Sequence, residues 1–340
     1  MHDGDREFAA AGYNLPLMGN TIILYERIHE RGLSLLRAAG EVIAPESLEE
    51  EALLPLFARA DAVVVRAMGQ VSRRLMESAP RLKVVGRHGA GVDNIDVAAA
   101  SELGIWVVNT PAAPAESLAE QFLLLALALC RHFRQSERAL RRGEWNQRQH
   151  LVGKELAGKT VGIIGFGNTG RLIARKCHAA FDNRVLYSDP VRAPAEVEQA
   201  CGAEYVSLDQ LLAESDFVTL QVPLNRDTRH MIGAEEIARM KPSAFLLNLC
   251  RGPVWDEGAV LRALMERRIA GAATDVFEVE PPGRTAQMLL QLTNFTASPH
   301  TGGLTAEAME RMSLVAEDIV RVLESQPPKW PVNQPAKPRC

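Results

Sequence analysis

Short apolar runs alternate with amphipathic stretches along most of the chain after residue 20. In the first hundred residues the apolar runs have the length and β-branched content of strands, and helical patterns such as 47–58 and 72–78 lie between them. Because this alternation is typical of strands joined by crossover helices, it predicts a parallel sheet. The expected strands are 21–25, 41–43, 62–65, 82–85 and 105–108. Residues 1–20 lack this periodicity, and we interpret them as an extension.

The alternation returns in the second half of the chain. Between the two halves, residues 109–114 are rich in turn formers, and 117–134 has the pattern of one long helix with a nearly continuous apolar surface. A helix of that kind suits a domain junction or a subunit interface. The second half is predicted to contain strands at 161–164, 184–188, 204–206, 217–221, 244–248, 271–274 and 295–297, and helices at 208–214, 234–240 and 256–267.

A last helix, expected at 305–324, is not followed by another strand. We expect it to return to the first domain, which makes that domain discontinuous. The predicted fold is therefore α/β, with two doubly wound parallel-sheet domains. One is expected to comprise residues 1–113 and 305–340, and the other residues 114–304.

Three glycines, Gly165, Gly167 and Gly170, follow the predicted strand 161–164. In a G-x-G-x-x-G loop one glycine makes the tight turn, one lets the backbone approach a pyrophosphate, and one lets the next helix pack on the strand. That helix points free N–H groups and its positive dipole end at the phosphates. The motif alone is weak, but a strand before it and a helix after it favour a dinucleotide site over an unrelated glycine turn.

Asp189 supports this interpretation and favours NAD as the cofactor. It ends the predicted strand 184–188, about 20 residues after the glycines, where a carboxylate can accept hydrogen bonds from a ribose diol. The same negative charge would repel a 2′-phosphate, which disfavours NADP. Arg192 is close enough in sequence to offset that repulsion.

The composition, with 47% apolar and 24% charged residues and a net charge of −4, is typical of a soluble globular protein. The basic stretch 131–148 also contains acids, so a solvated helix face explains it better than a nucleic-acid site. The longest apolar run, 122–130, is too short to cross a membrane, and the first residues lack the apolar segment of a secretory signal. Five scattered cysteines without metal-ligand spacing favour the reducing cytoplasm and predict no metal site.

A second glycine-rich segment, 86–96, follows a predicted strand and precedes a helix. Its backbone N–H groups could face a ligand, and Asp93 or Asn94 could cap the helix. Two interpretations stay open: an anion site for a substrate carboxylate, or a glycine turn with a cap. The candidate substrate contacts here are Gly89, Ala90 and Gly91.

Three ionisable residues, Arg251, Glu280 and His300, follow predicted strands of the second domain. Ligands of open α/β sheets bind at the carboxyl ends of strands, so we expect these side chains beside the dinucleotide loop. A guanidinium can clamp the carboxylate of a 2-oxo acid, and an imidazole, whose ordinary pKa is about 6.5, can exchange a proton with the alkoxide. Glu280 would favour the protonated imidazole and orient it. Each residue alone has a simpler explanation as a surface or capping group, but the three together favour catalysis.

These segments resemble the D-isomer-specific 2-hydroxyacid dehydrogenase family, especially its phosphoglycerate dehydrogenase-like branch. The matching pieces are HGAGVDNID (88–96), GFGNTG (165–170), NLCRG (248–252), DVFEVEP (275–281) and SPHTGG (298–303). The resemblance implies an enzyme that transfers a hydride between NAD(H) and a D-2-hydroxy acid/2-oxo acid pair. It also implies a flavodoxin-like substrate domain, a Rossmann NAD-binding domain, and a homodimer joined through the latter.

The resemblance further implies individual roles for residues of this chain. Arg251, Glu280 and His300 correspond to the catalytic arginine, glutamate and histidine. The residues expected to contact NAD are Gly165, Gly167, Asn168, Thr169, Gly170, Asp189, Val222, Pro223, Cys250, Asp275 and Gly302.

Two positions depart from the phosphoglycerate enzymes, which often carry serine where Ala67 stands and usually asparagine where Pro114 stands. Arg66 is retained and could bind a phosphate or a second acid, or be a surface arginine at a strand end. We take Arg66 and Ala67 as candidate substrate contacts. The substrate alternatives are 3-phosphoglycerate and the hydroxypyruvate/glyoxylate pair.

A protein of another class also stays open: an NAD-sensing binding protein, like the transcriptional corepressors that resemble this family and retain the three catalytic residues. The chain lacks the long disordered arms that such proteins use for interaction, which favours the enzyme. Formate dehydrogenases also resemble the chain but have glutamine where Glu280 stands, so we disfavour that reading.

Overall fold

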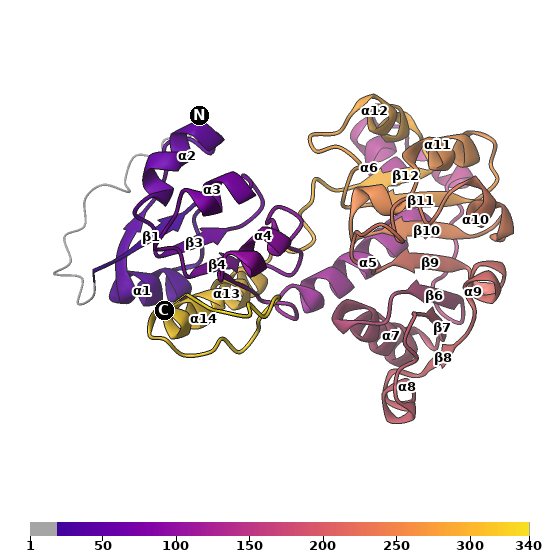
Figure 1. The fold of residues 1–340 in the computed structure, drawn as a ribbon. Helices are drawn as coiled ribbons and strands as arrows, with labels where there is room; N and C mark the ends of the chain where they lie inside the picture. The colour runs from indigo at the N-terminus through magenta and orange to yellow at the C-terminus, as the bar shows by residue number, and fades with distance from the viewer. Residues whose placement is uncertain (1–18, 340) are drawn as a thin grey trace. The chain divides into compact units, whose positions relative to one another are not determined.

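The computed structural model describes residues 19–339, which form two compact units. The first unit comprises residues 19–110 and 309–339, and the second comprises Pro111–Ala308 (Figure 1). The extension expected at residues 1–20 lies outside the described residues, apart from its last two positions.

A five-stranded sheet forms the centre of the first unit, with every strand pair parallel and the order β2-β1-β3-β4-β5. This is the flavodoxin-like strand order, so the predicted fold class is confirmed for this unit. Because both faces are covered, the strands are almost continuously apolar, as in the fully buried β3. The strands are β1 (Asn20–Leu24), β2 (Gly40–Ile43), β3 (Ala62–Val65), β4 (Val84–Arg87) and β5 (Trp106–Asn109).

The helices of the first unit cover the two faces of this sheet. On one face α1 (Glu30–Ala39) and α14 (Val315–Leu323) pack on β1, β3 and β4. The other face is covered by α2 (Glu50–Phe57), α3 (Arg73–Glu77) and α4 (Val97–Glu102). Asp318 of α14 accepts hydrogen bonds from the amides of Lys329 and Trp330, which holds the chain after α14 in place.

A seven-stranded sheet forms the centre of the second unit, again wholly parallel, in the order β12-β11-β10-β9-β6-β7-β8. Read from β8, this is the Rossmann order extended by one strand, and it confirms the predicted fold class. The strand order reverses between β6 and β9, which is the place where such sheets bind dinucleotides. The strands are β6 (Thr160–Ile164), β7 (Arg184–Ser188), β8 (Ala203–Tyr205), β9 (Phe217–Leu220), β10 (Phe245–Asn248), β11 (Gly271–Thr274) and β12 (Phe295–Ala297).

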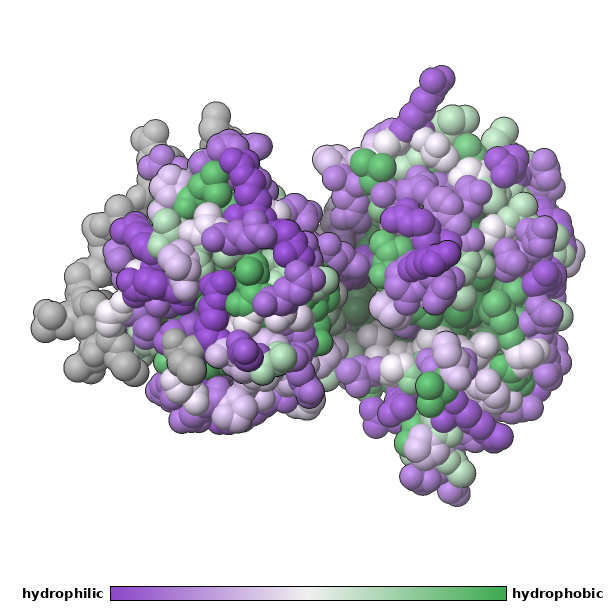
Figure 2. Space-filling model, in the orientation of Figure 1, coloured by the Kyte–Doolittle hydropathy of each residue, from purple (hydrophilic) through white to green (hydrophobic). Residues whose placement is uncertain are grey.

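Helices cover both faces of this sheet as well (Figure 1). One face is covered by α5 (Ala115–Cys130), α7 (Asn168–Phe181) and α8 (Ala195–Cys201). The other is covered by α9 (Leu208–Glu214), α10 (Ala234–Arg239), α11 (Glu257–Met265) and α12 (Arg284–Gln291). Two short 3₁₀ helices, η3 (Trp145–His150) and η4 (Gly252–Val254), complete the unit with α6 (Phe133–Arg141). On the face drawn in Figure 2, polar side chains predominate on both units.

Three local predictions are wrong. The helix expected at 117–134 ends at Cys130, because His132 adopts a left-handed conformation (φ 51°) before α6 begins. The helix expected at 305–324 is two helices, α13 (Ala306–Ser313) and α14. The cap of α4 is Asp96, whose carboxylate accepts a hydrogen bond from the amide of Ala99, and not Asp93 or Asn94. Periodicity alone cannot show a break of one residue in an apolar pattern.

Candidate active site

The glycine loop lies between β6 and α7, at the reversal of strand order. Gly165 has a φ of +95°, and a Cβ at this position would collide with the carbonyl oxygen of Gln221 after β9. A Cβ on Gly170 would collide with the carbonyl of Gly165, so only glycine lets α7 approach the loop so closely. Gly167 faces open space at the amino end of α7, where Asn168 and Thr169 begin the helix. This arrangement suits a pyrophosphate bound by free backbone N–H groups.

Asp189 follows β7 and folds back onto this loop. Its Oδ2 accepts a hydrogen bond from the amide of Phe166 at 2.8 Å, and its Oδ1 accepts one from Val191 at 3.0 Å. Arg192 donates two hydrogen bonds to Glu198, at 2.9 and 3.0 Å. The charge that could have offset Asp189 is therefore balanced by another acid, which favours NAD over NADP.

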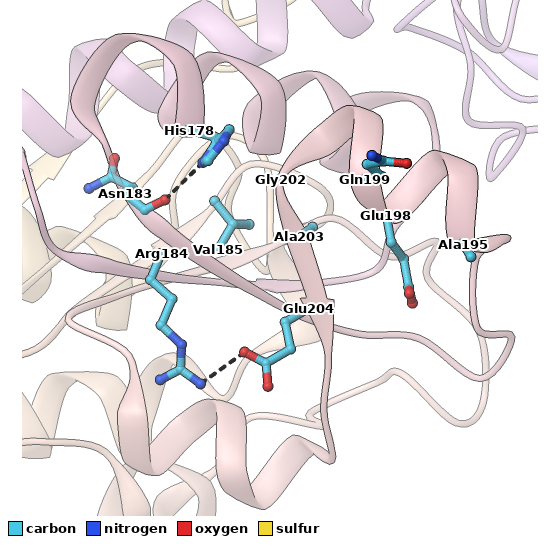
Figure 3. A pocket seen from close by; sticks show the side chains of 10 residues that line it. All are labelled: His178, Asn183, Arg184, Val185, Ala195, Glu198, Gln199, Gly202, Ala203 and Glu204. Carbon is cyan, nitrogen blue, oxygen red and sulfur yellow. Dashed lines mark hydrogen bonds and ion pairs between the residues drawn. The ribbon is translucent and has the colours of Figure 1, made fainter.

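The second unit also has a hollow of about 500 Å³ beside the amino ends of β7 and β8 (Figure 3). His178 of α7 contacts the carbonyl of Asn183 there, and Arg184 forms an ion pair with Glu204. The glycine loop, Glu280 and His300 follow the carboxyl ends of strands. The hollow is therefore not the candidate active site.

His300 and Glu280 are brought together at the carboxyl ends of β12 and β11. Nδ1 of His300 lies 2.8 Å from Oε2 of Glu280, and Oε1 of Glu280 accepts a hydrogen bond from the amide of Phe277 at 3.0 Å. Burial alone raises the pKa of Glu280, but the hydrogen bonds from His300 and Phe277, with the nearby charges of His300 and Arg251, lower it below its usual value. Glu280 is thus held as a carboxylate against the imidazole.

The backbone of His300 is left-handed, with a φ of 54°, a conformation that costs an L-residue roughly 1–2 kcal/mol. Its amide donates to the carbonyl of Asp275 at 2.8 Å. The buried carboxylate of Asp275 accepts hydrogen bonds from Ser298 Oγ at 2.5 Å, Thr301 N at 2.9 Å and Gly302 N at 2.7 Å. Asp275, which directly follows β11, therefore holds the loop that carries His300.

Arg251 follows β10, the neighbour of β11, in a turn that Asn248 organises. The buried amide of Asn248 donates to the carbonyl of Arg251 at 2.9 Å and accepts from the amide of Cys250 at 3.1 Å. Gly252 packs directly on the peptide of Phe277, where a Cβ would collide, so this turn touches the loop that carries Glu280. Burial raises the pKa of the Cys250 thiol to about 11, which keeps it protonated.

The predicted substrate contacts of the first unit lie after neighbouring strands, Arg66 and Ala67 after β3 and Gly89–Gly91 after β4. The amides of Ala67 and Met68 donate to the carboxylate of Glu26, at 2.6 and 2.8 Å. The amide of Gly89 donates to Thr110 Oγ1 at 3.2 Å. Within residues 19–339, the amides of Ala90 and Gly91 have no hydrogen-bond partner. These two amides could bind an anion.

His88, beside these glycines, is buried, and neither ring nitrogen has a hydrogen-bond partner within the described residues. Burial, followed by the charges of Arg66 and Arg87, lowers its pKa to about 4. It is therefore a neutral core residue at physiological pH.

Sequence reasoning did not identify a second histidine–carboxylate pair at this edge of the second unit. Nε2 of His230 lies 2.5 Å from Oε1 of Glu278, and the amide of Glu278 donates to the buried Glu257. The pair ties the segment after β9 to the loop that carries Glu280. Glu278 lies in the segment 275–281 that the sequence analysis singled out, two residues before Glu280. No local sequence pattern connects Glu278 with His230.

Sequence comparison identifies the family of the chain. The profile of the "D-isomer specific 2-hydroxyacid dehydrogenase, NAD binding domain" matches residues 123–302, more than half of the chain. The chain belongs to the D-isomer specific 2-hydroxyacid dehydrogenase family. The predicted family is therefore confirmed, and with it an NAD-dependent oxidoreductase that acts on a CH–OH group.

Individual relatives of this dehydrogenase carry several names. A D-3-phosphoglycerate dehydrogenase of Methanocaldococcus jannaschii is 42% identical over 320 residues, 94% of this chain and 60% of that protein. A hydroxypyruvate reductase of Thermotoga maritima is 41% identical over 283 residues, 83% of this chain and 90% of that protein. The crystal structure of a glyoxylate reductase from Paecilomyes thermophila is similar with a TM-score of 0.84 at 31% identity, covering 92% of this chain and 98% of that one.

Residues 19–339 contain neither a candidate membrane-spanning helix nor a candidate metal-binding cluster. This part of the dehydrogenase contains no helix long and apolar enough to cross a membrane. It also contains no group of three or more His, Cys, Asp or Glu residues arranged to hold a metal ion.

Asp189→Ala should reduce the preference of the dehydrogenase for NADH over NADPH by roughly tenfold, because the repulsion of a 2′-phosphate is lost. The measurement is kcat/KM for both cofactors at constant ionic strength. Asp209→Ala, which removes an exposed acid of α9 that pairs with Arg239, serves as the control. An unchanged ratio in Asp189→Ala would contradict the role of this carboxylate.

Proposed function

We propose that the chain interconverts a D-2-hydroxy acid and its 2-oxo acid with NAD(H), using His300 and Glu280 as the acid–base pair and Arg251 as the substrate-binding cation. The observation that carries the proposal is the 2.8 Å contact between His300 and Glu280, on the edge of the sheet that also bears the glycine loop. Arg251 follows the adjacent strand, close enough for its charge to lower the pKa of Glu280.

The proposed mechanism assigns one task to each side chain. When bound, the cofactor supplies or accepts the hydride at C2 of the substrate. Because Nδ1 of His300 faces Glu280, Nε2 is the nitrogen that gives its proton to the carbonyl oxygen during reduction. Glu280 stabilises the imidazolium and holds the ring in one orientation. In the oxidation direction the neutral imidazole takes the hydroxyl proton back.

Arg251 would bind the acid group of the substrate. A guanidinium is permanently charged and can form paired hydrogen bonds with a carboxylate. In the first unit, the amides of Ala90 and Gly91 and the side chain of Arg66 after the neighbouring strand are separate candidate donors for anionic oxygens. The permanent charge of Arg251 suits a small 2-oxo acid, and the names of the relatives point to glyoxylate, hydroxypyruvate or a 3-phosphoglycerate-derived acid.

Wild-type enzyme should oxidise NADH with at least one acid among glyoxylate, hydroxypyruvate and phosphohydroxypyruvate, and His300→Ala should lower kcat by roughly 10²–10⁴, the usual contribution of a general acid–base group. Steady-state absorbance at 340 nm gives both results. His178→Ala, at the hollow beside the amino ends of β7 and β8, is the matched control. NAD binding without turnover of any acid would favour the NAD-sensing alternative.

Glu280→Gln should move the falling limb of the pH profile for reduction to lower pH. The lowered pKa of Glu280 keeps the carboxylate ionised in the working range, where it favours the protonated imidazole. The amide cannot supply that charge, so the charged imidazole loses its electrostatic partner. Profiles of kcat between pH 5 and 9 test this, and coincident limbs in the two proteins would exclude the pairing.

We infer that the second unit forms a homodimer interface through α5, α6 and η3. Helix α6 has no buried residue, although it contains apolar side chains. An exposed apolar surface of this kind is typical of an interaction site, and a homodimer is the commonest assembly. The large apolar residues of this surface, each more than half exposed, are Leu124, Phe133, Leu140, Trp145 and Val152.

Phe133→Glu combined with Leu140→Glu should convert the dimer to a monomer, because two charges would be buried on one face of α6. Sedimentation velocity gives the mass of each species. Met265→Glu, an equally exposed apolar position on α11, should leave the dimer intact. A monomeric wild type would refute the interface.

We also infer that the enzyme works in a reducing compartment such as the cytoplasm. The four cysteines described by the structure, Cys130, Cys177, Cys201 and Cys250, are all unpaired and buried. Fractionation of cells with detection of the protein tests this, and recovery from an oxidising compartment would contradict it.

A further inference from the structure

Helix α5 touches the loop that carries His300 at both ends of that loop. Gln121 Nε2 donates to Ser298 Oγ at 2.8 Å. One helical turn earlier, the buried Ser117 donates from its hydroxyl to the carbonyl of Gly302. Residues four apart lie on one face of a helix, so both side chains point to the same loop.

The contact of Gln121 continues to the buried carboxylate that organises the loop. The hydroxyl of Ser298 has one hydrogen, which it donates to Asp275 Oδ1 at 2.5 Å. Ser298 can therefore only accept a hydrogen bond from Gln121. The two consecutive hydrogen bonds thus run from Gln121 to Ser298 and from Ser298 to Asp275. Asp275 in turn holds the amides of Thr301 and Gly302, on the other side of His300.

This chain of bonds bears on His300 because the loop is strained. His300 has the left-handed conformation, which an L-residue keeps only when its surroundings impose it. The imidazole itself is about half exposed, and its one hydrogen bond to a described side chain is that to Glu280. The direction of the ring therefore depends on the backbone of residues 298–302.

We propose that Gln121 and Ser298 are positioning residues for the acid–base step, which hold His300 against Glu280 through Asp275. The proposal rests on the proposed function, since it concerns the delivery of the His300 proton. Gln121 and Ser298 act through the loop that carries His300.

The test uses Gln121→Leu and Ser298→Ala in the full-length enzyme. A misplaced imidazole should lower kcat by roughly 10- to 100-fold, while the KM for NADH stays within about twofold. The falling limb of the pH profile should also move to lower pH, as in Glu280→Gln, because the ring loses its partner. Gln210→Leu, which removes an exposed glutamine of α9 that bonds Glu214, is the matched control.

A double-mutant comparison separates positioning from general destabilisation. In a His300→Ala background, Gln121→Leu should cause no further loss of turnover, because its effect passes through the imidazole. The proposal would be overturned if Gln121→Leu lowered kcat by the same factor in both backgrounds. It would also be overturned if kcat of both single variants stayed within twofold of the wild type. Ser298→Thr keeps the hydroxyl and should retain more activity than Ser298→Ala.

Hydrogen exchange provides a readout that does not depend on activity. The amides of Thr301 and Gly302 are bonded to Asp275, so both single variants should exchange faster in a peptide spanning 298–304. If the wild type turns over no 2-oxo acid but exchange still increases, the proposed reaction fails and the loop contacts stand. If the wild type is active and exchange is unchanged, the positioning role fails and the reaction stands.

Discussion

The proposed acid–base site depends on one buried carboxylate, that of Asp275. It accepts hydrogen bonds from three groups of a single loop and is only 1% exposed. A buried charge is tolerated only where donors surround it, so the loop must close over Asp275 in one conformation. That conformation places His300 in the left-handed region and directs its ring to Glu280. The hydrogen bonds to Asp275 thus offset the free energy of the strained backbone at His300.

The strand order of the second unit determines which chemical groups can meet. β9, β10, β11 and β12 are consecutive neighbours, so the segments after them follow one another along one edge. Val222, Arg251, Glu280 and His300 belong to these four segments, and the glycine loop follows β6, the other neighbour of β9. A nucleotide at the reversal of strand order would therefore lie beside the cation and the acid–base pair. In the first unit, backbone amides and Arg66 follow two neighbouring strands.

Several ionic groups of the second unit have a defined partner. Glu280 faces His300, and Glu278 faces His230, which gives two histidine–carboxylate pairs within a few residues of each other. Glu198 takes the charge of Arg192, so Asp189 acts without a neighbouring cation from that segment. The buried Glu257 has a raised pKa, first because of burial and then because of the charge of Glu278. In this fold of the D-2-hydroxyacid dehydrogenase family, these pairings place a carboxylate against the ring of His300.

The sequence by itself determined the fold class, the family and the cofactor, because these depend on local signals: apolar runs of strand length, glycines at fixed spacing and an acid at the end of a strand. Most strand positions follow from the same periodicity to within one or two residues. What only the tertiary structure decided are contacts between segments far apart in the chain. Gln121 meets Ser298 and His230 meets Glu278 across 177 and 48 residues, and no local pattern encodes such a distance. The breaks at His132 and between α13 and α14 were also missed, because a local change of backbone dihedrals leaves the surrounding apolar pattern intact.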